Sequence, residues 1–185
     1  MSTLAPVERP ARPTLTLVIV LSATFMQLLD ISIVNTAIPS IQESLHTTYA
    51  NIQLVLAGYQ LGFACTLITG ARLGDVYGRR RMFMIGMLCF TLTSVLCGAA
   101  TSAPMLVTSR VLQGISSGLM FPQVLAVIQV TFKPEERGKA LSAFGAAIGL
   151  GTIMGPLAGG LLIQAHIFND AEDIERLLAA LRDLV

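Results

Sequence analysis

The sequence predicts an all-α membrane protein with five transmembrane helices followed by a short amphipathic helix. Of its 185 residues, 54% are hydrophobic and only 12% are charged, whereas about a quarter of the residues of a soluble domain are charged. The charged residues gather in short clusters between long apolar runs. Each run provides the roughly 20 residues that a helix needs to cross the hydrocarbon core.

The apolar runs give the order of the spans. A cytoplasmic N-terminal segment is predicted at 1–13, and a transmembrane domain at 14–165. The first run is too long for a signal peptide, whose apolar region has about 7–15 residues, so we expect a retained span. The predicted spans cover about 14–38, 50–70, 82–100, 105–130 and 140–165.

The Lys and Arg residues before the first span and between the spans all fall on one side of the membrane. They are Arg9, Arg12, Arg72, Arg79, Arg80, Arg81, Lys133, Arg137 and Lys139. Short loops rich in Lys and Arg stay in the cytoplasm. The sequence therefore predicts a multi-pass protein of the plasma or inner membrane with a cytoplasmic N-terminus.

The tail at 166–185 differs in character from the rest. Its acidic part, 169–185, has apolar residues at helical spacing, Ile174, Leu177, Leu178 and Leu181, which is typical of an amphipathic helix. It is too charged to be a sixth span, and the alternation of spans puts it outside. The sequence leaves open whether it is a soluble helix or lies on the membrane surface.

The sequence contains no pattern typical of an enzyme, a cofactor site or a metal site. Cys65, Cys89 and Cys97 lie inside apolar runs without a CxxC pair, so we interpret them as small hydrophobic residues. A phosphate-binding Gly-x-x-x-x-Gly-Lys-Ser/Thr motif is missing from the sequence, so transport driven by ATP is not expected. The arginine cluster is explained by topology, and no nucleic-acid partner is predicted.

Polar residues interrupt the spans where plain membrane anchors would need none. Asp30 and Asn35 lie in the first span, and Arg110 and Gln113 lie in the fourth. An ionisable residue inside a span is costly and is by default a functional hypothesis. The alternatives are a structural aspartate bonded to a neighbouring helix and an arginine that reaches back to the membrane surface.

Two further clusters lie at the ends of the second span and within the fifth. The segment 72–81 is a compact basic loop, in which Gly74 and Gly78 permit a tight reversal and Asp75 meets the positive end of the third helix. In the fifth span, glycines repeat every four residues on one face, which allows close approach of another helix, and Pro156 bends the helix. Ordinary glycine packing is the alternative. The repeating glycines are Gly151, Gly155 and Gly159.

These clusters resemble signatures of the major facilitator superfamily, in the same order and on the same spans. The basic loop is similar to the family pattern Gly-x-Leu-x-Asp-Arg-x-Gly-Arg-Arg, and it departs from this pattern at Ala71 and Val76. The matching residues are Leu73, Asp75, Gly78, Arg79 and Arg80.

The other three clusters resemble the drug:proton antiporters of the fourteen-span subfamily. Leu29–Pro39 is similar to their first-span signature, with Ser32 in place of threonine. Arg110, Gln113 and Gly114 are similar to the fourth-span motif, in which Ser116 replaces a commoner glycine. The fifth span matches the antiporter motif at Gly151, Gly155, Pro156, Gly159 and Gly160.

The resemblance implies proton-coupled efflux of small amphipathic or cationic compounds. Its implied partners are the lipid bilayer, a small-molecule substrate and protons. Proton coupling would fall to Asp30, Asn35, Arg110 and Gln113. The basic loop would act as a gate, and the fifth-span glycines would serve close packing.

The resemblance covers about 14–165, whereas 166–185 does not resemble the family. Facilitators have two six-span halves with the substrate between them, and the fifth-span glycine face and the basic loop are expected to pack against the second half. We therefore expect a truncated piece, a frameshifted product or a half-size protein that needs another protomer, inactive by itself. The alternative is a non-transporting membrane remnant or an interacting half-subunit. The substrate and the oligomeric state are left open.

Overall fold

The computed structural model describes the backbone of residues 12–167 and the side chains up to Leu161. The described chain is helical and contains no strand. Its helices are α1 (Pro13–Ser44), α2 (Tyr49–Tyr77), α3 (Arg79–Gly98), α4 (Ala103–Thr131) and α5 (Pro134–Ile167). All five are long and apolar enough to cross a membrane, which confirms the predicted fold class. The amphipathic helix predicted at 169–185 lies outside the described residues.

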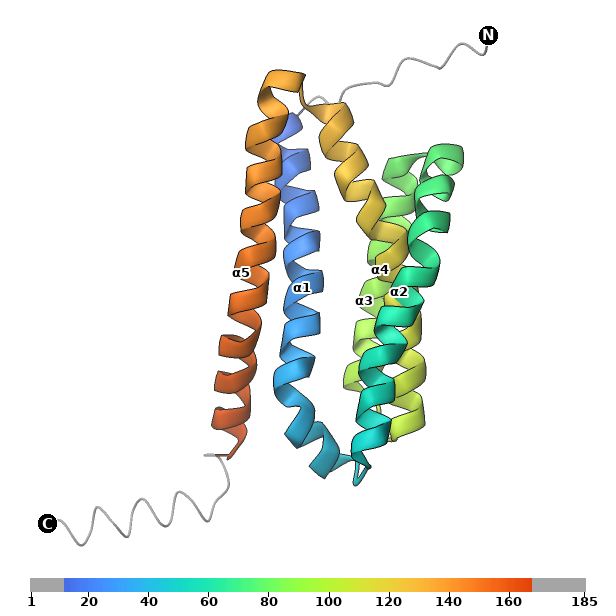
Figure 1. Ribbon diagram of the computed structural model, residues 1–185, viewed down its shortest axis with the longest axis vertical. Helices are drawn as coiled ribbons and strands as arrows, with labels where there is room; N and C mark the ends of the chain where they lie inside the picture. Colours follow the sequence, from blue (N-terminus) through green and yellow to red (C-terminus); the bar gives the residue numbers. More distant parts are fainter. Residues whose placement is uncertain (1–11, 168–185) are drawn as a thin grey trace, which may run out of the picture.

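The helices extend beyond the predicted spans because hydropathy detects only their apolar parts. α1 continues through Pro39 to Ser44, and it bends near this end in Figure 1. α5 begins at Pro134, so the segment Glu135–Lys139 is the first part of a helix and not a loop. Glu135 and Glu136 lie in this first turn, where the helix dipole favours negative charge.

The basic loop predicted at 72–81 is reduced to a single residue. α2 runs through Gly74 and Asp75 to Tyr77, and α3 begins at Arg79. Gly78 alone joins the two helices, with φ at +92°, a conformation that glycine adopts without strain. The expected reversal is therefore at Gly78, whereas Gly74 is buried within α2.

The helices form two groups that lie side by side in Figure 1. α4 packs extensively against α2 and α3, and α1 packs against α5. Direct packing of α1 on α4 and of α4 on α5 is much sparser. α4 is the most buried of the five helices.

One end of the bundle carries most of the described Lys and Arg residues, and we call it the basic end. It contains the α2–α3 and α4–α5 connections and lies at the top of Figure 1. Near it, an apolar core joins α1, α3, α4 and α5. The core residues are Val20, Ala23, Phe83, Met120, Val124, Ile128, Ala140 and Phe144.

Large apolar side chains cover the outside of the bundle. Leu61, Ile68 and Val95 are 65%, 77% and 65% exposed. On a soluble protein such a surface would be an aggregation hazard, whereas in a bilayer it meets lipid tails. The molecule is therefore a multi-pass membrane protein in its packing as well as in its composition.

Candidate functional site

An ion pair between α1 and α4 is the centre of the candidate site. Arg110 Nη1 donates to Asp30 Oδ2 at 2.7 Å. The side chain of Arg110 is only 4% exposed, and that of Asp30 is 17% exposed. Arg110 therefore does not reach back to the membrane surface, and its charge is balanced inside the bundle.

Gln113 completes a ring of hydrogen bonds with the pair. Its Oε1 accepts from Arg110 Nη1 at 2.8 Å, and its Nε2 donates to Asp30 Oδ1 at 3.1 Å. Gln113 is completely buried, and it lies three residues after Arg110, on the same face of α4. Both oxygens of Asp30 thus accept a hydrogen bond.

A second polar layer lies next to this ring. Tyr59 donates from its hydroxyl to Ser117 Oγ at 2.8 Å and accepts from Gln27 Nε2 at 3.4 Å. The guanidinium carbon of Arg110 lies 5.8 Å from the centre of the Tyr59 ring, within reach of a cation–π interaction. α1, α2 and α4 are therefore linked through polar side chains.

Cys97 on α3 also reaches the ring. Its thiol donates to Gln113 Oε1 over 3.6 Å, so this oxygen accepts from both Cys97 and Arg110. A thiol is a weak donor, and its contribution is small beside that of the guanidinium. Its position nevertheless brings the end of α3 into contact with the site.

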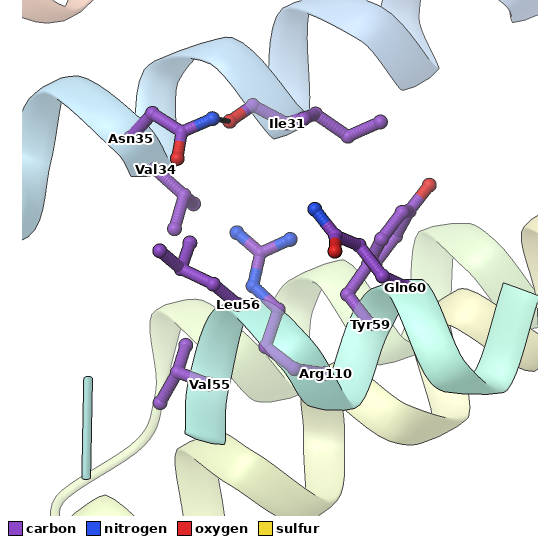
Figure 2. A pocket seen from close by; sticks show the side chains of 8 residues that line it. All are labelled: Ile31, Val34, Asn35, Val55, Leu56, Tyr59, Gln60 and Arg110. Carbon is purple, nitrogen blue, oxygen red and sulfur yellow. Dashed lines mark hydrogen bonds between the residues drawn. The ribbon is translucent and has the colours of Figure 1, made fainter. Parts of the chain in front are cut away.

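Two cavities meet at Arg110. The smaller, of about 30 Å³, is lined by Asn35, Gln60, Tyr59 and apolar neighbours, and Figure 2 shows Gln60 and Arg110 extending toward α1. The larger, of about 390 Å³, is lined by Asp30, Arg110 and residues of α1, α3 and α4.

Asn35 stands apart from the Asp30–Arg110–Gln113 ring. Its Nδ2 donates to the carbonyl oxygen of Ile31, one turn back on α1, at 3.0 Å, as Figure 2 shows. Asn35 is exposed at the smaller cavity. The structure thus brings three of the four predicted proton-coupling residues together, and the fourth faces the space beside them.

The predicted gating residues lie at the basic end, far along α2 from the ion pair. Asp75 accepts from Arg79 Nη2 at 2.9 Å across the Gly78 turn, in an exposed i,i+4 pair. Leu73 is half-buried, and Arg80 is exposed. Of these residues, Asp75 and Arg79 bridge the turn between α2 and α3.

Gln123 anchors this end of α2 to α4. Its Nε2 donates to the carbonyl oxygen of Gly70 at 2.7 Å, and its side chain is 1% exposed. A Cβ atom on Gly74 would overlap the Gln123 amide. A larger residue at position 74 would therefore displace the Gln123 amide from its place beside Gly70.

The α5 glycines pack against α1 within this chain. Cβ atoms on Gly151, Gly155 and Gly159 would meet Leu28, Ser32 and Thr36 of α1. The expectation that this face contacts the second half was therefore wrong. Gly160 does not share the α1 contact, since a Cβ atom there would meet no other atom within 4 Å.

Several polar residues of the site had not been predicted. Tyr59, Gln27 and Ser117 form the second layer, Cys97 touches Gln113, and Gln123 holds α2. Gln27 lies three residues before Asp30, and Ser117 lies four residues after Gln113. Their helical spacing from Asp30 and Gln113 was the one signal in the sequence that could have identified Gln27 and Ser117.

Comparison with known proteins places the chain in a family. Residues 20–168 match the family model described as Major Facilitator Superfamily. The chain is 44% identical over 159 residues to a probable actinorhodin transporter of Streptomyces coelicolor. It is 40% identical over 153 residues to a tetracenomycin C resistance and export protein of Streptomyces glaucescens.

These alignments cover 86% and 83% of this chain but only 28% of each relative. A bacterial homologue of the human lysosomal transporter Spinster, solved in an inward-facing and occupied conformation, has a similar fold. Its TM-score is 0.75 at 19% identity, over 93% of this chain and 37% of that structure. The fold, the family model and the relatives agree, and the chain belongs to the major facilitator superfamily.

Proposed function

We propose that this chain supplies the proton-handling part of a secondary transporter that exports small amphipathic or cationic compounds in exchange for protons. The buried Asp30–Arg110 pair carries this proposal, because charged groups within apolar helices are costly and rare without a function. Two relatives are named for actinorhodin transport and for tetracenomycin C export, which supports efflux as the direction.

Protonation of Asp30 would act on the link between the two groups of helices. Asp30 on α1 bonds to Arg110 on α4, and Gln27 on α1 bonds to Tyr59 on α2. Direct packing of α1 on α2 and on α4 is otherwise sparse. A proton on Asp30 removes the ion pair, while Gln113 and the Tyr59 ring still hold the guanidinium. The link between the α1–α5 pair and α2, α3 and α4 is then weaker, and it rests on the Gln27–Tyr59 bond and the apolar core.

The turn at the basic end would serve as the cytoplasmic gate. The single-residue connection at Gly78 couples the ends of α2 and α3, and the exposed Asp75–Arg79 pair spans it. Gln123 transmits such a movement to α4 through the Gly70 carbonyl. With the N-terminus inside, this end faces the cytoplasm.

Transport by this mechanism needs a second half, because the substrate of a facilitator binds between two halves. The chain spans about 28% of the length of the relatives described above. We propose that the rest comes from a longer chain or from another protomer, and that these five helices alone export nothing. The same short span supports a second candidate function, a membrane protein that keeps the fold without transport.

Accumulation of a fluorescent cationic dye in an efflux-deficient bacterium tests both candidates. Residues 14–165 of this chain would replace the matching part of the probable actinorhodin transporter of Streptomyces coelicolor. The chain alone would be compared with this chimera. We expect the chimera to lower dye accumulation, a proton uncoupler to abolish the effect, and the chain alone to have none.

Two variants of the chimera test the proton site. Asp30→Asn should abolish the effect, whereas Glu43→Gln, which changes an exposed acid on the same helix, should preserve it. Lowered dye accumulation with the chain alone would refute the need for a second half. An active Asp30→Asn chimera would refute the role of Asp30.

A further inference from the structure

Tyr59 on α2 contacts both groups of helices at one point. Its hydroxyl accepts from Gln27 on α1 and donates to Ser117 on α4, and its ring lies 5.8 Å from the guanidinium carbon of Arg110. Tyr59, Gln27 and Ser117 are all buried. The hydroxyl and the ring of one side chain thus serve different partners.

The backbone of α2 lies directly on α4 at this level. Gly114 follows Arg110 by one turn on α4, and a Cβ atom there would overlap the carbonyl oxygen of Tyr59. A Cβ atom on Gly62, one turn further along α2, would likewise overlap the backbone of α4. A shift of α2 relative to α4 is therefore opposed where the Tyr59 ring meets the guanidinium.

The Tyr59 ring and the Asp30 carboxylate hold Arg110 in different ways. Asp30 attracts it by opposite charge, and this attraction ends when the carboxylate is protonated. The ring is neutral, and it attracts a cation through its quadrupole whether Asp30 is charged or not. Such an interaction is strongest where the cation has lost its water, and the side chain of Arg110 is only 4% exposed.

The membrane surface competes for Arg110 once its counter-charge is lost. Arg110 lies about two turns from Ala103, the first residue of α4, and long cationic side chains near helix ends reach back to the surface. Its Nε has no hydrogen-bond partner among the described residues, and Gln113 Oε1 is shared with Cys97. Hydrogen bonds to the described residues therefore leave the guanidinium incompletely satisfied when Asp30 is neutral.

We propose that Tyr59 is a positioning residue for proton exchange, whose ring retains Arg110 in the bundle while Asp30 is protonated, so that the ion pair can form again. The proposal rests on the proton-exchange function proposed above. In the same step, the hydroxyl of Tyr59 keeps α1 next to α4 through Gln27 and Ser117. Tyr59 itself neither gains nor loses a proton.

Thermal unfolding of the intact chain in detergent tests the role of the ring. Tyr59→Leu is compared in the native chain, in Asp30→Asn, which imitates the protonated carboxyl, and in Asp30→Asn with Arg110→Gln, which also removes the cation. We expect its fall in melting temperature to be about twofold larger in Asp30→Asn than in the native chain, because the ring then holds a cation without a counter-charge. The fall should be smallest where the cation is removed. A tyrosine that only fills space gives the same fall in all three backgrounds, and that result would overturn the proposal.

Two comparisons protect this test against variants that do not fold. If Asp30→Asn gives no folded protein, the native chain and the background without the cation still decide, because retention of Arg110 requires a smaller fall in the latter. Tyr49 on the same helix is 62% exposed, so Tyr49→Leu should give the same small fall in every background. A fall for Tyr49→Leu that changes with the background as that for Tyr59→Leu does would also overturn the proposal.

Dye efflux by the transport chimera separates the ring from the hydroxyl. Tyr59→Leu should slow efflux about tenfold, and Tyr59→Phe, which restores the ring, should recover most of this loss. Tyr49→Leu should export at the native rate. Equal losses for Tyr59→Phe and Tyr59→Leu, or full export by Tyr59→Leu, would overturn the role of the ring and leave proton exchange standing. A chimera that exports nothing with Tyr59 in place would overturn the function proposed above, and with it the role of Tyr59 in proton exchange.

Discussion

Arg110 places a planar guanidinium between the Asp30–Gln113 acceptors and the Tyr59 ring, and lysine has no such planar group. One nitrogen, Nη1, donates to both Asp30 and Gln113, and the planar guanidinium lies near the Tyr59 ring. Lysine offers a compact charge on a flexible stem. In the transport chimera, an Arg110→Lys variant with full proton-driven export would contradict a requirement for this geometry.

The buried ion pair is expected to show strong coupling between its two members. Arg110→Gln alone leaves an uncompensated carboxylate inside the bundle and should lower the free energy of unfolding by about 3–5 kcal/mol. The double variant Asp30→Asn, Arg110→Gln should recover most of this loss. Thermal unfolding of the purified chain in detergent, followed by size-exclusion chromatography, measures both effects.

The exposed pair at the basic end is the matched control. Asp75 and Arg79 are 57% and 39% exposed, and such pairs contribute about 0–1 kcal/mol. Arg79→Gln should therefore leave the melting temperature nearly unchanged. Equal losses for Arg79→Gln and Arg110→Gln would show that burial of the ion pair has no energetic consequence.

At the scale of residues, the sequence identified the charged members of the site and missed most of their neutral partners. Asp30 and Arg110 could be found because a charge inside an apolar run is conspicuous. Tyr59 and Cys97 could not, since aromatic and small residues are ordinary in membrane helices. Only the packing of α2 and α3 against α4 decides that these two side chains face the ion pair.

At the scale of elements, α5 has two glycine faces with different surroundings. Gly155 lies against Ser32 of α1, whose hydroxyl donates to the Thr152 carbonyl at 3.2 Å. Gly149 lies elsewhere on α5, and a Cβ atom there would meet no other atom within 4 Å. Close packing of α1 and α5 therefore depends on the first glycine and not on the second.

Alanine at these two positions should have opposite effects. Gly155→Ala forces a methyl group into α1, and overpacking of this kind costs about 1–3 kcal/mol. Gly149→Ala places its methyl group in open space and should stabilise the helix by about 0.5–1 kcal/mol. Melting temperatures of the two variants, measured side by side, test this difference. Equal shifts would contradict the packing of α5 on α1.

The existence of the elements was easier to predict than their ends or their partners. Each apolar run became a helix, because a chain in a bilayer must satisfy its backbone hydrogen bonds internally. The polar ends, such as Arg72–Tyr77, continue as helix although hydropathy falls there. The partner of the α5 glycines was predicted wrongly, because helical spacing defines a face without saying which helix covers it.

At the scale of the whole molecule, the two ends of the bundle differ in charge and in packing. The basic end combines an apolar core with Arg79, Arg80 and Lys133 at its surface. The opposite end carries no Lys or Arg in its two connections, and the larger cavity extends toward it. Orientation in the membrane therefore decides which compartment each end faces.

The basic end is predicted to face the cytoplasm, because Lys and Arg in short loops are retained there. Alkaline phosphatase, which is active only outside the cytoplasm, reports the side of each fusion point. Fusions at Thr47 and at Ser102 in the connections of the opposite end should be active, and a fusion at Lys133 should be inactive.

Fluorescent protein, which matures in the cytoplasm, should give the complementary pattern at the same three points. Replacing Arg79, Arg80 and Arg81 with serine should weaken the preference of the basic end for the cytoplasm, because fewer positive charges then remain between α2 and α3. Active phosphatase at Lys133 with inactive enzyme at Thr47 would reverse the orientation. In that case the turn at Gly78, which is proposed above as the cytoplasmic gate, would lie on the outer side of the membrane.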